Sequence, residues 1–294
     1  MHATGAAVQG ATRVGARQIG ETDIRQVVDL LVRGYGKRRS RQFWQDMLDG
    51  LTERTVPPGF PRYGYVLESD GRLVGVMLLI FSTIWENGVP HVRCNGSGIY
   101  VEPAFRVYAQ LLIGRANRDK SVTVLNLTAA PHTHKMVEAT GFRRYVEGIV
   151  IALPLLSRSS RDGLRVIDAA DEPDAPFDAY ERDILVEHAG YGCTSLWGVT
   201  SERAHPFVFR PKIIKGVPSQ QLVYCRDIDS FVNSARPLGK YLALRGHFFV
   251  IVDANGPIPG VVGKYIGNRP RFFFGPNRPR LGDLAYTEIS LFGI

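Results

Sequence analysis

The stretch Gly98–Arg106 reads GIYVEPAFR and marks the passage from a buried strand to a helix. Alternating apolar residues before it predict a strand from about Arg93 to Val101. Pro103 ends this strand because proline has no amide hydrogen to donate to a sheet. A helix is predicted to follow, from about Val107 to Asn117. The order of elements on either side of this junction decides the fold.

Two helices and a hairpin are predicted before the junction. Thr22 is the predicted N-cap of the first helix, which ends near Gly34 or Gly36. The second helix carries Phe43, Trp44, Met47, Leu48 and Leu51, and Pro57 and Pro58 stop it. Asp70-Gly71 between Tyr65–Glu68 and Leu73–Phe81 predicts a hairpin, since glycine adopts a positive φ at low cost.

A strand at Val122–Leu127, a helix at Pro131–Thr140 and a strand at Val146–Leu153 are predicted after the junction. Pro154–Gly163 resembles a linker, and the N-terminal residues 1–12 resemble a frayed tail. The sequence therefore predicts an α+β fold with a mixed sheet and two domains, at residues 13–156 and 164–294.

The second domain is predicted to alternate strands and helices and to end in a tail of strands and turns. Its predicted strands are Leu164–Ile167, Thr194–Val199, Pro206–Ile214, Gln221–Cys225 and Phe248–Val252, and its helices are Phe177–His188 and Phe231–Leu244. VIVDANGPIPGV at 250–261 is similar to VLESDGRLVGV at 66–76. Either the two stretches are an internal echo, or both are ordinary hairpins.

Two motifs in the first half resemble the GNAT superfamily of acyl-CoA-dependent N-acyltransferases. The first is Val101-Glu102-Pro103, followed by Phe105 and Arg106. The second is the strand that contains Asn126, followed by a helix and then by Gly141-Phe142. The resemblance covers roughly residues 13–153. It implies a GNAT-like domain followed by a second, smaller or degenerate GNAT-like domain.

The resemblance implies acetyl-CoA or another acyl-CoA as cosubstrate, bound where two parallel strands splay apart. The implied cofactor-binding residues are Ile99, Val101, Arg106, Val107, Tyr108, Ala109 and Asn126. Backbone amides near Tyr100 and Val101 would hold the oxyanion, and the pyrophosphate would lie at the helix start near Val107. Asn126 either bonds the pantetheine arm or pins the splay, and Tyr108 either covers the pyrophosphate or packs.

The sequence departs from the family pattern at two places. In the pyrophosphate turn, Ala109 and Leu111 stand where the family has small residues, usually glycine, and their side chains hinder a close backbone approach. Val137 stands where many members have a tyrosine that acts as general acid. A thiol with a pKa near ~8.5 is a tolerable leaving group unaided, so this loss does not exclude catalysis.

The candidate catalytic residues are Glu102, Tyr100 and His134. Glu102 would take a proton from the attacking amine, or it is an exposed strand-end residue. His132 and His134 would either relay protons or bind phosphate. Alternatively, they are polar residues at the start of a helix. Because residues two apart on a helix point to different faces, a metal shared by the two histidines is not expected.

Composition narrows the partners and the compartment. The formal charge is +8, but the basic residues are scattered, and the densest run, Lys37–Arg41, suits a solvated face. Three widely spaced cysteines argue against a disulfide framework or a zinc site. The apolar stretches are far shorter than the ~20 residues of a membrane helix. A cytoplasmic location without membrane association is expected.

These observations predict transfer of an acyl group, most simply acetyl, from CoA to a small-molecule or peptide amine. The alternative is a catalytically inactive GNAT-derived binding or regulatory module. A nucleic-acid-binding protein is a third interpretation that rests on charge alone. The oligomeric state, homodimer included, is left open by the sequence.

Overall fold

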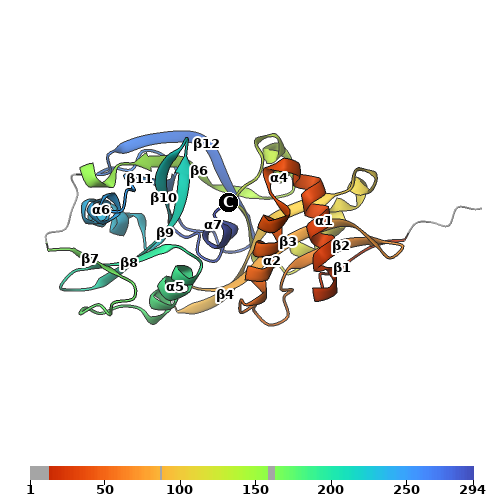
Figure 1. The fold of residues 1–294 in the computed structure, drawn as a ribbon, viewed down its shortest axis with the longest axis horizontal. Coiled ribbons are helices and arrows are strands. Elements are labelled where there is room, and N and C mark those ends of the chain that lie inside the picture. Colours follow the sequence, from red (N-terminus) through yellow and green to blue (C-terminus); the bar gives the residue numbers. More distant parts are fainter. Residues whose placement is uncertain (1–12, 87, 158–162) are drawn as a thin grey trace, which may run out of the picture. The chain divides into compact units, whose positions relative to one another are not determined.

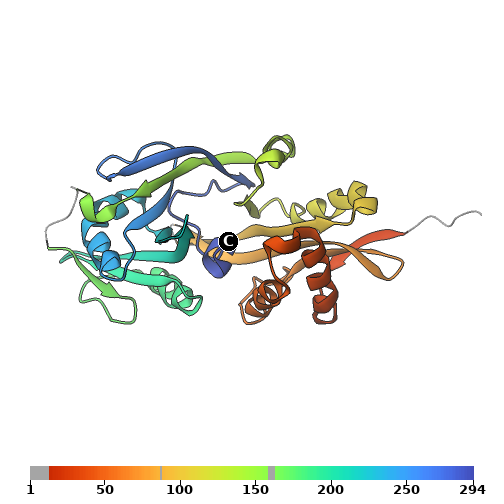
Figure 2. The ribbon, with the colours of Figure 1, turned by 45° about the horizontal axis from the view of Figure 1, so that its top comes forward.

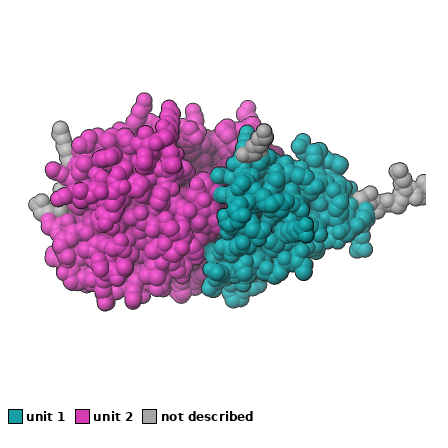
Figure 3. Space-filling view, viewed as in Figure 1, with its two compact units in different colours: residues 1–81, 98–119 teal, residues 82–97, 120–294 magenta. Residues whose placement is uncertain are grey.

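The computed structural model describes residues 13–86, 88–157 and 163–294. The chain forms two compact units (Figure 3). Unit 1 contains the chain up to Phe81 together with Gly98–Asp119, and unit 2 contains Ser82–Ser97 and Lys120–Ile294. The predicted division at residues 156–164 stays a prediction. The predicted tail, 1–12, and part of the predicted linker, 158–162, lie outside the described residues.

Unit 1 is a sheet covered on both faces by helices. Its elements are β1 (Val14–Gln18), α1 (Ile24–Tyr35), α2 (Arg41–Thr52), β2 (Gly64–Ser69), the first part of β3 (Arg72–Glu86), the end of β4 (Val89–Val101) and α3 (Ala109–Ala116). The neighbouring strands follow the order β1-β2-β3-β4. Helices α1 and α2 lie on one face and α3 on the other (Figures 1 and 2). Strands β3 and β4 contribute to both units.

The turn between β2 and β3 confirms the predicted hairpin. Asp70 and Gly71 have φ angles of 48° and 77°, the pair of positive values that a tight two-residue hairpin turn needs. The start of the first helix differs from the prediction. A short 3₁₀ turn precedes α1, and the Asp23 carboxylate accepts the Gly20 amide hydrogen at 2.8 Å, so Thr22 is not the cap.

Unit 2 is a mixed sheet with two long helices. Its own elements are β5 (Thr123–Asn126), α4 (His134–Ala139), β6 (Arg143–Ala152), β7 (Arg165–Asp168), α5 (Ala179–Gly190), β8 (Thr194–Val199), β9 (Ala204–Ile214), β10 (Val217–Cys225), α6 (Ile228–Ala243), β11 (Phe249–Ala254), β12 (Gly263–Phe274) and α7 (Glu288–Phe292). The strand order is β4-β5-β12-β6-β11-β10-β9-β8-β7. Fully buried aromatic residues such as Trp197, Phe207 and Phe231 fill its core.

Strand β12 lies between β5 and β6, far from its sequence neighbours. Phe272–Phe274 pair with β5 on one side, and Gly263–Phe273 pair with β6 on the other. Strand β11 pairs with the opposite edge of β6. The predicted hairpin at 250–261 is therefore wrong, because β6 separates the two strands that would have formed it. The three adjacent strands β12, β6 and β11 are visible together in Figure 1.

The second half of the chain repeats one feature of the first. Strands β4 and β5 are parallel neighbours with α3 between them in sequence, and β10 and β11 are parallel neighbours with α6 between them. This repeat supports a second GNAT-like region in the chain.

In the C-terminal tail, β12 confirms the prediction of strands, whereas a short helix at the end was not predicted. Residues 281–294, called the C-terminal segment below, include the short helix α7, and Tyr224 and Asp283 form an isolated bridge. No helix in the described part of the chain is long and apolar enough to cross a membrane.

Candidate active site

Strands β4 and β5 are paired at one end and separate at the other. Arg93–Asn95 pair in parallel with Thr123–Leu125, after which β5 ends at Asn126 while β4 continues to Val101. The unpaired part begins at the carboxyl ends of two parallel strands, where α/β folds usually hold their ligands. The pairing of β4 with β5 therefore ends at Asn95 and Leu125, and this end of the pair is called the β4–β5 splay below.

Glu288, the first residue of α7, lies at this splay. Its backbone amide donates to the Oδ1 atom of Asn95 at 2.6 Å. Its Oε1 atom accepts a hydrogen bond from the Thr128 hydroxyl at 2.8 Å. Asn95 belongs to β4, and Thr128 follows β5, so the glutamate joins the two strands where they part. The Glu288 side chain is fully buried, whereas Thr128 is exposed.

The Glu288 carboxyl group is poised to exchange a proton near neutral pH. Burial raises its pKa to about 7, and the hydrogen bond from Thr128 opposes part of that rise. Ser97 lies beside the same carboxylate without meeting hydrogen-bond geometry. Within residues 13–86, 88–157 and 163–294, neither Ser97 Oγ nor Glu288 Oε2 has a hydrogen-bond partner. A buried polar pair of this kind is suited to a polar ligand atom.

A buried ion pair holds the chain that leads to Glu288. Arg93 on β4 donates to Asp283 at 3.0 and 3.2 Å and to the Ala285 carbonyl at 2.6 Å. Burial alone would raise the pKa of Asp283, but Arg93 and Arg280 lower it to about 2. The carboxylate stays ionised, and the C-terminal segment stays fixed to β4.

Glu102 is engaged in ion pairs within unit 1. Its carboxylate lies 2.8 Å from Arg72 and 3.2 Å from Arg33. Both arginines therefore hold the Glu102 carboxylate in place beside β3 and α1. The local structure supports a structural role for Glu102, and its predicted catalytic role stays untested.

Tyr100 and Ile99 contact helix α1. The Tyr100 ring packs directly on the α carbon of Gly34, where a β carbon would collide with the ring. The Ile99 amide donates to the Tyr35 hydroxyl at 3.2 Å. Glu102, by contrast, donates its amide to Val74 of β3. The Ile99 amide therefore already has a hydrogen-bond acceptor, and the predicted roles of Ile99 and Tyr100 stay predictions.

The predicted pyrophosphate turn is a 3₁₀ helix, not the start of an α-helix. Residues Pro103–Tyr108 form the 3₁₀ helix, and α3 begins only at Ala109. The Ala109 amide already donates to the Arg106 carbonyl, so it is not one of the free donors that an anion needs. Val107 is 79% exposed and Leu111 43% exposed, and an anion would gain nothing from either apolar side chain.

His134 and Asn126 belong to unit 2. Nε2 of His134 lies 3.1 Å from the Ala129 carbonyl, and its ring packs against Phe272. This contact supports the interpretation of His134 as a helix-start residue. Asn126 is the last residue of β5 and pairs with Phe272 of β12.

The second splay, between β10 and β11, is filled by the protein itself. Ser219–Gln221 pair in parallel with Phe249–Ile251, and the strands then part. The Cys225 amide donates to the Gly282 carbonyl at 2.9 Å, and the Leu284 amide donates to the Val223 carbonyl at 2.7 Å. The C-terminal segment thus takes the place at β10 that a pantetheine arm would take in an open splay.

Solved structures with the same fold are GCN5-related N-acetyltransferases. One from Anabaena variabilis is 9% identical over 89% of this chain and 72% of its own, with a TM-score of 0.56. One from Kribbella flavida is 14% identical over 89% and 71%, with a TM-score of 0.52. A conserved protein of unknown function from Enterococcus faecalis is 12% identical over 93% and 74%, with a TM-score of 0.56.

These likenesses show that the chain has the GNAT fold. No protein-family model and no curated protein matches the sequence. The fold defines the chain as a GNAT-fold protein in which the C-terminal segment fills the β10–β11 splay.

Sequence reasoning missed Glu288, Asp283 and Arg93. Arg93 offered a signal, because a charged residue inside an apolar strand needs a buried partner. Glu288 offered none, since TEISLF at 287–292 is too short to show helical periodicity.

Proposed function

We propose that the protein transfers an acyl group from acyl-CoA to an amine at the β4–β5 splay. The observation that carries the proposal is a buried glutamate with a pKa of about 7 at the point where the two parallel strands of a GNAT fold part. A base whose pKa lies near the working pH is effective in proton transfer.

The amine nitrogen attacks the thioester carbonyl, a C–N bond forms, and the C–S bond breaks. The CoA thiolate leaves with the electron pair of the broken bond. The attacking nitrogen loses a proton to the Glu288 carboxylate. The proton passes either through a polar group of the acceptor molecule or through one water molecule. The Thr128 hydroxyl orients the carboxylate, because it holds Oε1 and leaves Oε2 for the proton.

The other predicted contacts belong to the same proposal. The predicted contacts of the pantetheine arm are Ile99 and Val101 on β4 and Asn126 at the end of β5. Arg106, Val107, Tyr108 and Ala109 would meet the pyrophosphate, in a pose that tolerates the 3₁₀ helix. The acceptor would be a small-molecule or peptide amine. A cytoplasmic location suits acyl-CoA chemistry and the free, buried thiols of Cys94, Cys193 and Cys225.

Calorimetric titration with acetyl-CoA, followed by thiol release with a panel of amines, tests the proposal. We expect acetyl-CoA to bind and at least one amine to release CoA. In Glu288→Gln, acetyl-CoA binding should persist while turnover falls by about 10²–10⁴-fold. Thr133→Ala, on the turn before α4, is the control and should leave both unchanged. Absence of heat and of thermal shift at millimolar acetyl-CoA would overturn the proposal.

The runner-up is a catalytically inactive GNAT-derived binding or regulatory module. The 3₁₀ helix Pro103–Tyr108 favours it, because the amide-rich helix start that holds pyrophosphate is lost there. This function predicts no thiol release with any amine, even if acetyl-CoA binds. Turnover that depends on Glu288 would exclude it.

A further inference from the structure

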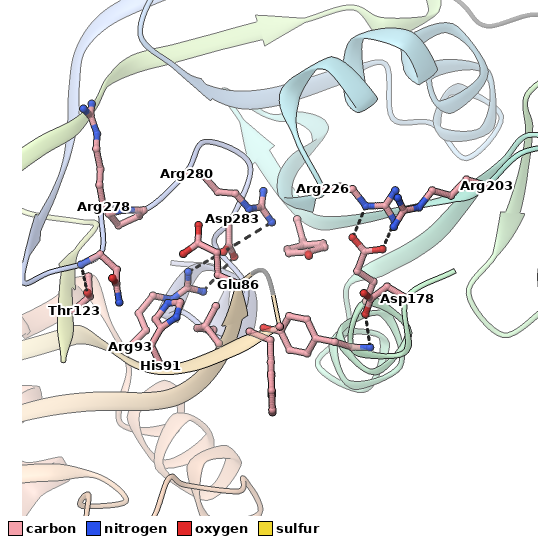
Figure 4. A pocket seen from close by; sticks show the side chains of 18 residues that line it. Glu86, His91, Arg93, Thr123, Asp178, Arg203, Arg226, Arg278, Arg280 and Asp283 are labelled. Carbon is pink, nitrogen blue, oxygen red and sulfur yellow. Dashed lines mark hydrogen bonds and ion pairs between the residues drawn. The ribbon is translucent and has the colours of Figure 1, made fainter. Parts of the chain in front are cut away.

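A second candidate site in unit 2 is a cavity of about 440 Å³, within the usual size range of small-molecule pockets. It lies at the carboxyl end of β10, beside the first turn of α5, and Figure 4 shows its lining. None of the residues of the β4–β5 splay, Asn95, Ser97, Thr128 and Glu288, lines it. The cavity is therefore distinct from the proposed acyl-transfer site.

One side of the cavity carries two guanidinium groups and one carboxylate. Arg93 and Arg280 share Asp283, at 3.0 and 3.9 Å. Arg280 donates to the Cys225 carbonyl at 2.6 Å and stacks over the Tyr224 ring at 4.9 Å. Because Arg93 satisfies Asp283 with two hydrogen bonds, most of the charge of Arg280 is left for a ligand.

The opposite side repeats this imbalance. Arg226 pairs with Glu181 through two hydrogen bonds, one of 2.8 Å, and the Arg226 side chain is 21% exposed. Figure 4 shows the exposed Arg203 pointing toward Arg226, so two guanidinium groups gather beside one carboxylate. Arg278 is a fifth arginine of the lining.

Two further carboxylates line the cavity, so its five arginines exceed its four carboxylates by one charge. Asp178 caps α5, where its Oδ1 accepts the Tyr180 amide hydrogen at 2.8 Å. Glu86 is exposed at the end of β3.

Aromatic side chains provide the apolar part of the lining. Trp85 is 47% exposed, an uncommon state for a tryptophan, and it lines the cavity together with Tyr180 and Tyr224. Burial raises the pKa of Tyr180 to about 12 and that of Tyr224 above its ordinary value, so both phenols stay neutral. A flat ring in the ligand would pack on these side chains.

We propose that this cavity binds a small dianion, a phosphate monoester or a dicarboxylate, whose body carries a flat ring. Arg280 and Arg203 take the charged groups, with Arg226 between Arg203 and Glu181, and the aromatic residues take the ring. A thioester arm is not the ligand here, because the C-terminal segment already pairs with the β10 edge. This site works whether or not the β4–β5 splay transfers acyl groups.

The test is calorimetric titration of the full chain with phenyl phosphate and phthalate, with glycerol phosphate and benzoate as poorer probes. We expect the aromatic dianions to bind best and benzoate at least tenfold more weakly. Arg203→Ala should weaken binding about tenfold or more, the loss of one charge-assisted contact. Affinity should fall as salt rises. A preference for phenyl phosphate over phthalate would identify phosphate as the source of the charge.

Control variants keep the result interpretable. Arg236→Ala removes an exposed arginine of α6 outside the cavity and should bind like the wild type. Arg280→Lys keeps the positive charge but loses the planar guanidinium with its paired N–H donors. It should therefore weaken binding without unfolding the protein. The proposal is overturned if no dianion binds at millimolar concentration, or if Arg203→Ala and Arg280→Lys bind as well as Arg236→Ala. If Arg203→Ala still binds acetyl-CoA, the cavity and the proposed acyl-transfer site are independent of each other.

Discussion

Burial of Glu288 makes the free energy of unfolding depend on pH. The pKa of its carboxyl group is about 7 in the folded protein and about 4.5 in the unfolded chain. Between these values the folded state holds the extra proton, so stability is complete below about pH 4.5 and falls as the pH rises toward 7. The difference is on the order of 3 kcal/mol.

Glu288→Gln should remove this pH dependence. We expect the free energy of unfolding of the variant, relative to the wild type, to rise by on the order of 3 kcal/mol between pH 4.5 and pH 7.5, since glutamine carries no charge to bury. Urea unfolding of both proteins across that range measures the difference, and other titrating groups cancel in the comparison. Parallel curves for the two proteins would show that Glu288 titrates normally.

Residues whose chemistry depends on distant partners were the hardest to predict. Glu102 stood out in the sequence because it adjoins Pro103, yet Arg72 and Arg33 neutralise it, and no pattern reveals that pairing. Arg93 and Asp283 are 190 residues apart. Local rules predict local structure, whereas these pairs are created by the tertiary fold.

At the scale of elements, the C-terminal segment behaves as a built-in strand for β10. Gly282 makes the close approach possible. Its φ is 76°, and an added β carbon would lie 2.6 Å from Cys225 Sγ. Both the backbone angle and the space require glycine at this position.

Gly282→Ala should destabilise the protein by about 2–4 kcal/mol, from backbone strain and overpacking together. Gly246→Ala is the matched control, since Gly246 has a φ of 81° and no atom within 4 Å of an added β carbon. That variant should lose only the backbone part, about 1–2 kcal/mol. Chemical denaturation compares the two. Equal losses would mean that the fit against Cys225 is unimportant.

Strand β12 is held in place by a buried ion pair. Arg271 donates to both carboxylate oxygens of Asp253 on β11, one bond being 2.9 Å, and to the Leu127 carbonyl at 3.0 Å. These contacts link β12 to β11 and to the end of β5.

Arg271→Met should cost about 3–5 kcal/mol, because Asp253 would be left buried and unpaired. Combining it with Asp253→Asn should recover part of the loss, since the uncompensated charge disappears. A double-mutant cycle from thermal or urea unfolding measures the coupling. Losses that simply add would show that the two side chains act independently.

Most single elements were predictable, but their neighbours were not. The Asp70-Gly71 hairpin and the helices α1, α2, α5 and α6 follow from periodicity and turn residues. The place of β12 between β5 and β6 does not, because GNRPRFFF at 267–274 specifies a strand without specifying its partners. The 3₁₀ helix at Pro103–Tyr108 was also missed, since Val107 and Leu111 look like the apolar face of a longer helix.

At the scale of the whole molecule, the C-terminal segment serves two places within unit 2. It pairs with β10 through Gly282 and Leu284, and it supplies Glu288 to the β4–β5 splay. The C-terminal segment thus fills the β10–β11 splay and places a carboxyl group at the β4–β5 splay. The two similar strand pairs of this protein therefore differ in what the C-terminal segment does at each.

Removal of residues 281–294 should therefore have a local and a functional effect. We expect β10 amides near Val223 and Cys225 to exchange hydrogen faster, while those of α1 and α2 in unit 1 keep their protection. Any amine-dependent thiol release should be lost together with Glu288. Hydrogen exchange read by mass spectrometry measures the first effect. Unchanged protection of β10 would show that the segment does not stabilise that edge.

The position of β12 also has a consequence for synthesis on the ribosome. When β5 and β6 have emerged, their facing edges still lack the strand that belongs between them, and more than a hundred further residues must be translated before it arrives. The nascent chain passes through this interval with two open sheet edges, the feature that makes growing polypeptides prone to wrong pairing. Translation speed or chaperone capture during that interval would govern how much of the chain reaches its native form.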